Sequence, residues 1–297
     1  MIERNSAGGS GPTSSHAVEV EDLDIEIDGV HWHYQAAGSG APILLIHGLL
    51  GYSFSWRHLM PVLARHRRVF AVDLPGAGFS DRPANLDCTL RASAERVLKF
   101  LDRVGVEECD LLGTSHGGGV AMFAAALAPS RFRRLVLVAP INPWSGRGTF
   151  LSVVLSKPPF ASTIVNFAPG VPLLHDFYLR RLFGDTRRMQ PGTAEGYTEP
   201  LRHPRAFDYP MRILRSWNSD LRGLRSRLYK IADIPTLLLW GSLDGAVYAS
   251  SATRLAQEFR DAQVVTLDGV GHLPYEEVPD EFNRAVEAFL LKSPSRR

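Results

Sequence analysis

The stretch Leu111–Gly119 reads Leu-Leu-Gly-Thr-Ser-His-Gly-Gly-Gly and joins two segments of different character. An apolar run from Cys109 to Leu112 enters it, and an alanine-rich run from Val120 to Leu127 leaves it. The first run is typical of a buried strand and the second of a helix, so the pattern predicts a strand, a tight turn and a helix with Ser115 at the apex. Such a turn lifts the serine hydroxyl above the sheet and directs the first helical N–H groups toward the same space.

The glycines on either side of this serine have a steric explanation. Gly113 and Gly117 complete the pattern G-x-S-x-G, and a side chain at either position would collide with the neighbouring strand or helix. The pattern occurs by chance in many chains, so it is a hypothesis until its context supports it. The alternative is a glycine-rich helix start without chemistry. The strand, turn and helix around Ser115 favour a nucleophile.

Length and composition restrict the class of protein. The 297 residues suffice for one large domain or for a domain with an inserted subdomain. Lys and Arg number 33 against 31 Asp and Glu, so global charge recruits neither nucleic acid nor a membrane. The two cysteines, Cys88 and Cys109, form neither a disulfide framework nor a metal-binding spacing, which suits a reducing compartment. Nothing in the sequence indicates the oligomeric state.

The N-terminal segment and the apolar runs bear on location. Residues 1–16 are rich in Gly and Ser and lack the apolar core of a signal peptide, so we interpret them as a disordered tail. No uninterrupted apolar run reaches the length of a membrane span. We therefore expect a cytoplasmic protein without stable membrane insertion.

Strands and helices alternate through the first half of the chain. Residues 18–27 alternate apolar and acidic residues, and Asp28-Gly29 is a hairpin signal before a return strand at 30–36. Apolar strands then alternate with helical segments, which predicts a mainly parallel sheet covered on both faces. The predicted strands are 42–46, 68–72, 109–112 and 134–139, and the predicted helices are a segment ending near 65, then 89–104 and 115–128.

The alternation stops after Pro140 and resumes with a strand at 235–240. Residues 142–232 carry many prolines and helical fragments, which predicts a cap inserted over the carboxyl ends of the strands, where open α/β sheets bind ligands. Residues 17–141 and 233–297 form the predicted core. Its second part has a helix at 250–260, a strand at 263–267 and a closing helix at 280–291.

A nucleophilic Ser115 requires a base, and an acid that orients this base. His272 lies between Gly271 and Leu273, directly after the strand 263–267, so it is the candidate base. Asp244 follows the strand 235–240 and is the candidate acid, while its alternative role is that of a turn residue beside Gly245. Ser115, Asp244 and His272 then follow one another in the order expected for a nucleophile elbow.

Other acids fit less well. Asp268 belongs to the same strand end as the histidine, which makes it a poor rival to Asp244. The loop after the strand 134–139 carries Asn142, and no carboxylate occurs between Asp110 and Asp176.

The oxyanion of an acyl-transfer reaction needs two hydrogen-bond donors. The backbone N–H of His116 follows the nucleophile, and the turn after His47-Gly48 places the N–H of Leu49 as the second donor. We interpret the ring of His47 as ordering its loop and that of His116 as structural. No cluster with metal-ligand spacing and no cofactor motif is present, so the mechanism predicts neither a metal nor a cofactor.

The chain resembles the α/β-hydrolase superfamily, in particular its capped esterase, haloperoxidase-like and carbon–carbon hydrolase branches. The resemblance covers about residues 17–141 and 233–291 and implies an eight-stranded, mainly parallel sheet with an inserted helical cap. In that family the matching serine attacks, the matching histidine is the base and the matching aspartate orients it. The motifs that carry the resemblance are His47-Gly48, Asp73-Leu-Pro-Gly-Ala-Gly-Phe-Ser80, Gly113-Thr-Ser-His-Gly117, Trp240-Gly-Ser-Leu-Asp244 and Gly271-His272.

Two features bear on this resemblance. Epoxide hydrolases and haloalkane dehalogenases look similar but carry aspartate at the position of Ser115, which argues against both activities here. Asp244 is followed by Gly-Ala-Val-Tyr, where many relatives have a Val-Pro pair, and this departure weakens the assignment of Asp244.

The predicted cap is basic. Residues 142–233 hold 14 Lys and Arg against 7 Asp and Glu, a net charge of +7, and the whole chain is +2, which leaves −5 for the rest. The arginines either steer anionic substrates or pair with carboxylates of the core.

The segment Phe150–Leu174 is strongly apolar, and Pro158-Pro159 excludes one continuous helix. We interpret this segment as a wall that faces the substrate, with Phe150, Phe160 and Trp144 as contact residues. Transient membrane contact is the alternative.

The sequence thus predicts a serine hydrolase that cleaves small to medium esters with an apolar acyl or alcohol part. Carbon–carbon bond hydrolysis and cofactor-free base catalysis on the same fold remain open, because the sheet carries the catalytic residues while the cap selects the substrate. A non-catalytic receptor on this fold is the rival from another class, although it would not require all three catalytic positions.

Overall fold

The computed structural model describes residues 18–145, 156–157 and 159–292. The predicted tail 1–16 and Phe150 lie outside these residues. Within them the chain forms an eight-stranded sheet with the order β1-β2-β4-β3-β5-β6-β7-β8, in which only the pairs β1/β2 and β2/β4 are antiparallel. The predicted fold class is therefore confirmed. The strands are β1 (Val20–Ile27), β2 (Val30–Ala37), β3 (Ala41–Ile46), β4 (Arg67–Val72), β5 (Cys109–Thr114), β6 (Phe132–Val138), β7 (Thr236–Gly241) and β8 (Ala262–Leu267).

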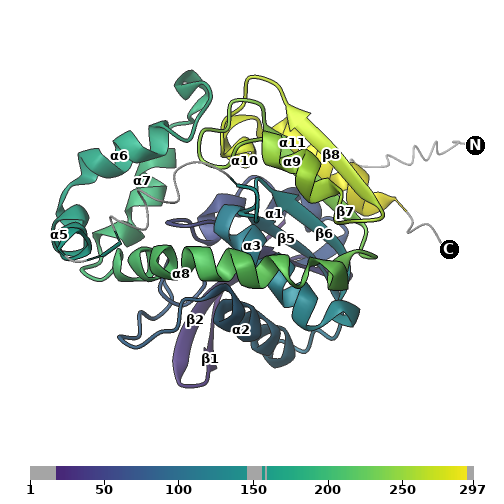
Figure 1. Cartoon of the computed structure of the whole chain (residues 1–297), viewed down its shortest axis with the longest axis horizontal. Coiled ribbons are helices and arrows are strands. Elements are labelled where there is room, and N and C mark those ends of the chain that lie inside the picture. Colours follow the sequence, from purple (N-terminus) through teal and green to yellow (C-terminus); the bar gives the residue numbers. More distant parts are fainter. Residues whose placement is uncertain (1–17, 146–155, 158, 293–297) are drawn as a thin grey trace, which may run out of the picture.

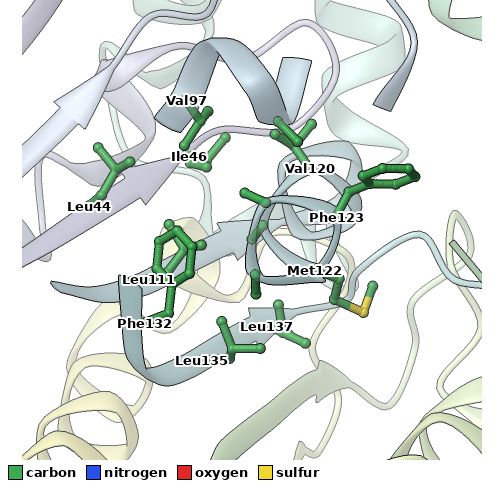
Figure 2. Packing of buried hydrophobic residues seen from close by; sticks show 14 of the residues in the cluster. Leu44, Ile46, Val97, Leu111, Val120, Met122, Phe123, Phe132, Leu135 and Leu137 are labelled. Atoms are coloured by element: carbon green, nitrogen blue, oxygen red, sulfur yellow. The ribbon is translucent and has the colours of Figure 1, made fainter. Parts of the chain in front are cut away.

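The central strands have buried side chains on both faces because helices cover the sheet from both sides. One face packs against α2 (Leu90–Arg103), α3 (Ser115–Leu127) and α9 (Ser250–Ala256). The other packs against α1 (Met60–Leu63) and α11 (Pro279–Leu291). Figure 2 shows the first face, where side chains of β3, β5 and β6 meet those of α2 and α3.

Helix α3 is surrounded by protein. Its residues from His116 to Ala126 are all buried, since it lies between the sheet and the helices α2 and α8 (Asp208–Arg225). This position explains why it is apolar all round, whereas α2 has one apolar face. Helix α2 begins as predicted: the hydroxyl of Thr89 accepts a hydrogen bond from the N–H of Ala92 at 3.2 Å.

The predicted helix ending near residue 65 is wrong in extent. The segment forms a 3-10 turn (Ser53–Trp56) and the single turn of α1.

Between β6 and β7 the chain leaves the sheet and forms the cap (Figure 1). The cap contains α5 (Phe160–Phe167), α6 (Pro172–Arg180), α7 (Thr193–Thr198) and α8 (Asp208–Arg225). Helix α8 contacts α2 and α3, while α5 and α6 lie at the left edge of Figure 1. None of the helices in the described ranges has the length and hydropathy needed to cross a bilayer.

Candidate active site

The turn at Ser115 is as tight as a strand–helix junction can be, because β5 ends at Thr114 and α3 begins at the next residue. Ser115 has a φ of 51°, a left-handed backbone conformation that residues other than Gly rarely adopt. A Cβ on Gly113 would lie 2.4 Å from the carbonyl oxygen of Gly117, and one on Gly117 would lie 2.2 Å from that of His47. Both glycines of the pattern are therefore sterically required.

The loop after β3 passes directly over the serine. A Cβ on Gly48 would lie 3.2 Å from the Cβ of Ser115. The ring of His47 orders this loop: its Nε2 accepts from the N–H of Leu74 at 3.0 Å, so its Nδ1 donates to the carbonyl of Gly48 at 2.8 Å. These two bonds require a neutral ring. Burial lowers the pKa of His47 more than the nearby charge of Asp73 raises it, which favours this neutral form.

The two backbone groups predicted to bind an oxyanion belong to the first turn after this serine and to the loop that passes over it. His116 is in the first turn of α3, where N–H groups have no partner within the helix. Its ring is buried edge-on against Tyr209 with the centroids 6.2 Å apart, and burial together with His47 lowers its pKa to about 3. Leu49 lies on the loop that contacts Ser115 and borders the adjoining cavity. The oxyanion role of both N–H groups stays a prediction.

Asp244 and His272 come from neighbouring strand ends and meet. Nδ1 of His272 lies 2.7 Å from Oδ2 of Asp244, and both residues are buried. Oδ1 of Asp244 accepts from the N–H groups of Ala246 and Val247 at 2.8 and 2.9 Å. The loop that departs from the Val-Pro pattern therefore holds the carboxylate toward the histidine.

The rival positions serve other partners. Asp268 accepts from the hydroxyl of Ser242 at 3.1 Å, and the amide of Asn142 donates to the carbonyl of Pro140 and to the hydroxyl of Ser251. Neither is hydrogen-bonded to His272.

Ser115 and His272 border the same cavity of about 610 Å³ between the sheet edge and the cap. The serine hydroxyl makes no hydrogen bond to the imidazole in this structure. Catalytic hydrogen bonds of unliganded enzymes are commonly long and shorten in the substrate complex. The structure thus brings the predicted nucleophile and base to one space without joining them.

The cavity wall is mostly apolar, and the described residues that form it include no Lys, Arg, Asp or Glu. The core contributes the loop after β3, the elbow and the histidine loop, and the cap contributes residues of α5 to α8. Its apolar and aromatic wall residues include Ile141, Ile164, Tyr178, Leu179, Tyr197, Leu201, Phe207, Leu214, Trp217 and Tyr275. Such a wall suits a neutral, largely apolar ligand.

The predicted substrate contacts Phe160 and Trp144 do not form part of this wall. Phe160 is the first residue of α5 and about half exposed. The guanidinium groups of Arg225 and Arg254 lie over the ring of Trp144, 6.0 and 5.8 Å from its centroid. Neither residue lies at this cavity, and their role as substrate contacts stays a prediction.

The sequence reasoning missed the wall residues of the cap. Leu214 and Trp217 stand three residues apart on α8, so the helical period of that segment could have identified them. Tyr197 lies on the short α7, and no local pattern marks it.

Part of the basic charge of the cap is held in ion pairs away from the cavity. Arg180 and Asp176, and likewise Arg205 and Asp208, form ion pairs within the cap. Arg188 reaches the core and pairs with Glu277 at 3.2 Å. Among the residues that the structure describes, no group of three or more His, Cys, Asp or Glu is arranged to hold a metal ion.

Known proteins resemble this chain over most of its length. The 2-hydroxy-6-oxo-2,4-heptadienoate hydrolase of Pseudomonas putida is 28% identical over 270 residues, which cover 88% of this chain and 93% of that protein. Haloalkane dehalogenase 2 of Mycobacterium bovis is 28% identical over 266 residues, 86% of this chain and 89% of that protein. The crystal structure of a membrane phospholipase A, a bacterial virulence factor, is 28% identical with a TM-score of 0.75 and covers 91% of this chain and 86% of that one.

The profile of the alpha/beta hydrolase fold family matches residues 41–279. This match includes the serine elbow, the cap and the histidine loop, and it agrees with the strand order and the inserted cap. The chain belongs to the α/β-hydrolase fold family.

Proposed function

We propose that this protein is a serine hydrolase that cleaves small to medium carboxylic esters with an apolar acyl or alcohol part. The observation that carries the proposal is the arrangement at one cavity: a strained serine and a histidine border it, and a buried aspartate lies 2.7 Å from that histidine. This is the set of groups that converts an alcohol into a nucleophile at neutral pH.

The mechanism follows from the positions of these groups. His272 removes the proton of the Ser115 hydroxyl, and the serine oxygen attacks the ester carbonyl. The N–H groups of Leu49 and His116 stabilise the resulting oxyanion. The imidazolium, stabilised by Asp244, then protonates the departing alcohol and leaves an acyl-enzyme. Water activated by the same histidine hydrolyses the acyl-enzyme and restores the serine.

The cavity wall favours a neutral ester. Burying a charged ligand without an opposite charge is costly, and no Lys or Arg stands among the described wall residues. The aromatic and aliphatic wall formed by the cap offers contact to an acyl chain or an aryl group. The likeness to a protein named a phospholipase A, hence an acyl-ester hydrolase, agrees with this choice.

Carbon–carbon bond hydrolysis is the second candidate, because a relative bears the name of a heptadienoate hydrolase. That name denotes a carboxylate anion, which would need a cationic partner in the cavity. The described wall lacks one, so we rank this reaction below ester hydrolysis. Turnover of 2-hydroxy-6-oxo-2,4-heptadienoate at a higher kcat/KM than p-nitrophenyl butyrate would reverse the ranking.

Dehalogenation is disfavoured for a chemical reason despite the relative named a haloalkane dehalogenase. Displacement of halide by a carboxylate gives an ester, which water can cleave by attack on its carbonyl. Displacement by Ser115 would give an ether without a carbonyl, and the enzyme would stop after one turnover. The serine at this position therefore points to acyl transfer.

Labelling with a fluorophosphonate probe tests the proposal. We expect covalent modification at Ser115, none in Ser115→Ala, and a loss of p-nitrophenyl butyrate hydrolysis of about 10⁶-fold in kcat for this variant. Asp244→Asn is expected to retain the fold and to lose about 10⁴-fold, because the amide leaves the imidazole in the wrong tautomer. Absence of labelling in the wild type would favour the non-catalytic receptor instead.

A further inference from the structure

Glu277, the last residue of α10 (Pro274–Glu277), has a fully buried side chain that joins two segments of the molecule. Its Oε2 accepts from the N–H of Gly271 at 2.9 Å and from the N–H of Gly184 at 2.8 Å. Its Oε1 accepts from the N–H of Asp185 at 2.9 Å and from Nη1 of Arg188 at 3.2 Å. One carboxylate thus binds the residue before His272 and three residues of the cap.

The same two segments are also joined by hydrogen bonds that do not involve Glu277. The N–H of His272 donates to the carbonyl of Leu182 at 2.7 Å, and Nη1 of Arg188 donates to the carbonyl of Gly269 at 3.1 Å. A Cβ on Gly271 would lie 2.3 Å from the carbonyl oxygen of Leu182, so the two backbones are in direct contact. The loop that carries His272 is therefore held from the cap side.

The buried charge of Glu277 depends on donors from both segments. A buried carboxylate needs several donors to compensate for lost hydration, and here three backbone N–H groups and one guanidinium supply them. Two of the three N–H groups belong to the cap, so the carboxylate is satisfied only while residues 182–188 are in place. The neighbouring Glu276 serves other groups, since it bonds Arg57 and the hydroxyl of Tyr197.

We propose that Glu277 is a positioning residue that couples the cap segment 182–188 to the loop of His272, so that the imidazole keeps its place beside Asp244 and at the cavity of Ser115 only while this segment is seated. The proposal rests on the hydrolase function proposed above. It follows that a displacement of this part of the cap would withdraw an ordered base from the serine. The chemical step then requires a seated cap segment.

The substitution Glu277→Gln tests the coupling. An amide offers one acceptor oxygen, and its NH₂ group would face N–H donors, so two of the four bonds are lost. We expect kcat for p-nitrophenyl butyrate to fall about 10- to 100-fold with KM changed by less than about threefold, since a small misplacement of a catalytic group acts on the chemical step. The rate of fluorophosphonate labelling should fall in parallel.

Glu276→Gln is the matched control, because it makes the same change one residue away without touching the histidine loop. We expect it to slow labelling far less than Glu277→Gln does. Arg188→Met removes one partner of Glu277 and the contact to Gly269, and it leaves the three backbone N–H donors of Glu277 in place. We expect this variant to lower kcat about two- to fivefold, which keeps the test decisive if Glu277→Gln does not fold.

The outcomes separate this proposal from the proposed function. A wild type that is labelled, together with unchanged kcat in folded Glu277→Gln or Arg188→Met, would overturn the coupling and leave the hydrolase intact. A loss of kcat equal to that of Glu276→Gln would assign Glu277 a general structural role and also overturn it. Failure of the wild type to react with the probe would instead refute the hydrolase.

Discussion

The sheet edge and the cap enclose the same cavity, but they differ in how closely their atoms are packed. At the sheet edge, backbone atoms lie so close that Gly113 and Gly117 admit no side chain. In the outer cap, α5 and α6 leave large apolar side chains in solvent: Phe167 is 69% and Leu173 is 83% exposed. The comparison teaches that steric contacts fix the backbone around Ser115, whereas the outer cap carries apolar side chains that no such contact constrains.

We expect the largest difference between the sheet edge and the cap in the free energy of unfolding of glycine-to-alanine variants. Gly117→Ala places a methyl group 2.2 Å from the carbonyl oxygen of His47, a backbone atom that cannot rotate away. We expect the free energy of unfolding to fall by about 3 kcal/mol. Gly170→Ala in the cap meets no heavy atom within 4 Å, and we expect a change within about 0.5 kcal/mol.

Urea unfolding of both glycine variants measures this contrast. The slope of the transition should stay unchanged, so that the midpoints report stability. Equal midpoints for Gly117→Ala and Gly170→Ala would show that the elbow can relax, and the proposed difference between the two regions would be lost.

The same contrast explains what could be predicted from the sequence. Ser115, Asp244 and His272 each follow a strand with a clear apolar run, and parallel strands bring their carboxyl ends to one edge. Local pattern therefore sufficed to place them near one another. The cap wall combines residues of four helices, and a residue such as Tyr197 on the short α7 reaches it through contacts that no local period encodes. The structure accordingly brings the residues predicted at the sheet edge to one cavity, whereas Phe160 and Trp144 lie outside its described wall.

We expect an effect of intermediate size on the pH dependence of stability, and it arises from His116 in the core. Burial, with His47 nearby, lowers the pKa of His116 from 6.5 to about 3, so the unfolded chain binds a proton between these values that the folded chain does not. Stability from this group is complete above pH 6.5 and is lost as the pH falls toward 3, by about 2 kcal/mol at pH 5.

Unfolding at pH 8 and pH 5 checks this pH effect. His116→Gln cannot take up the proton, and we expect the difference in stability between the two pH values to shrink by that amount. His203→Gln, in an exposed part of the cap, should change the difference far less because solvent screens its charge. An undiminished pH dependence in His116→Gln would mean that the folded state accommodates the charged ring.

The smallest effect concerns substrate choice, which we assign to the cap. Ile164 on α5 borders the cavity, whereas Phe167 on the same helix is exposed. Ile164→Trp should narrow the apolar space and lower kcat/KM for p-nitrophenyl octanoate about tenfold relative to p-nitrophenyl acetate, the usual scale of discrimination by an apolar pocket. Phe167→Trp places the same indole on the outer surface and should leave this ratio unchanged. If both variants, or neither, altered the ratio, the wall formed by α5 would not select the acyl chain, and the contrast between a fixed edge and a selective cap would have to be abandoned.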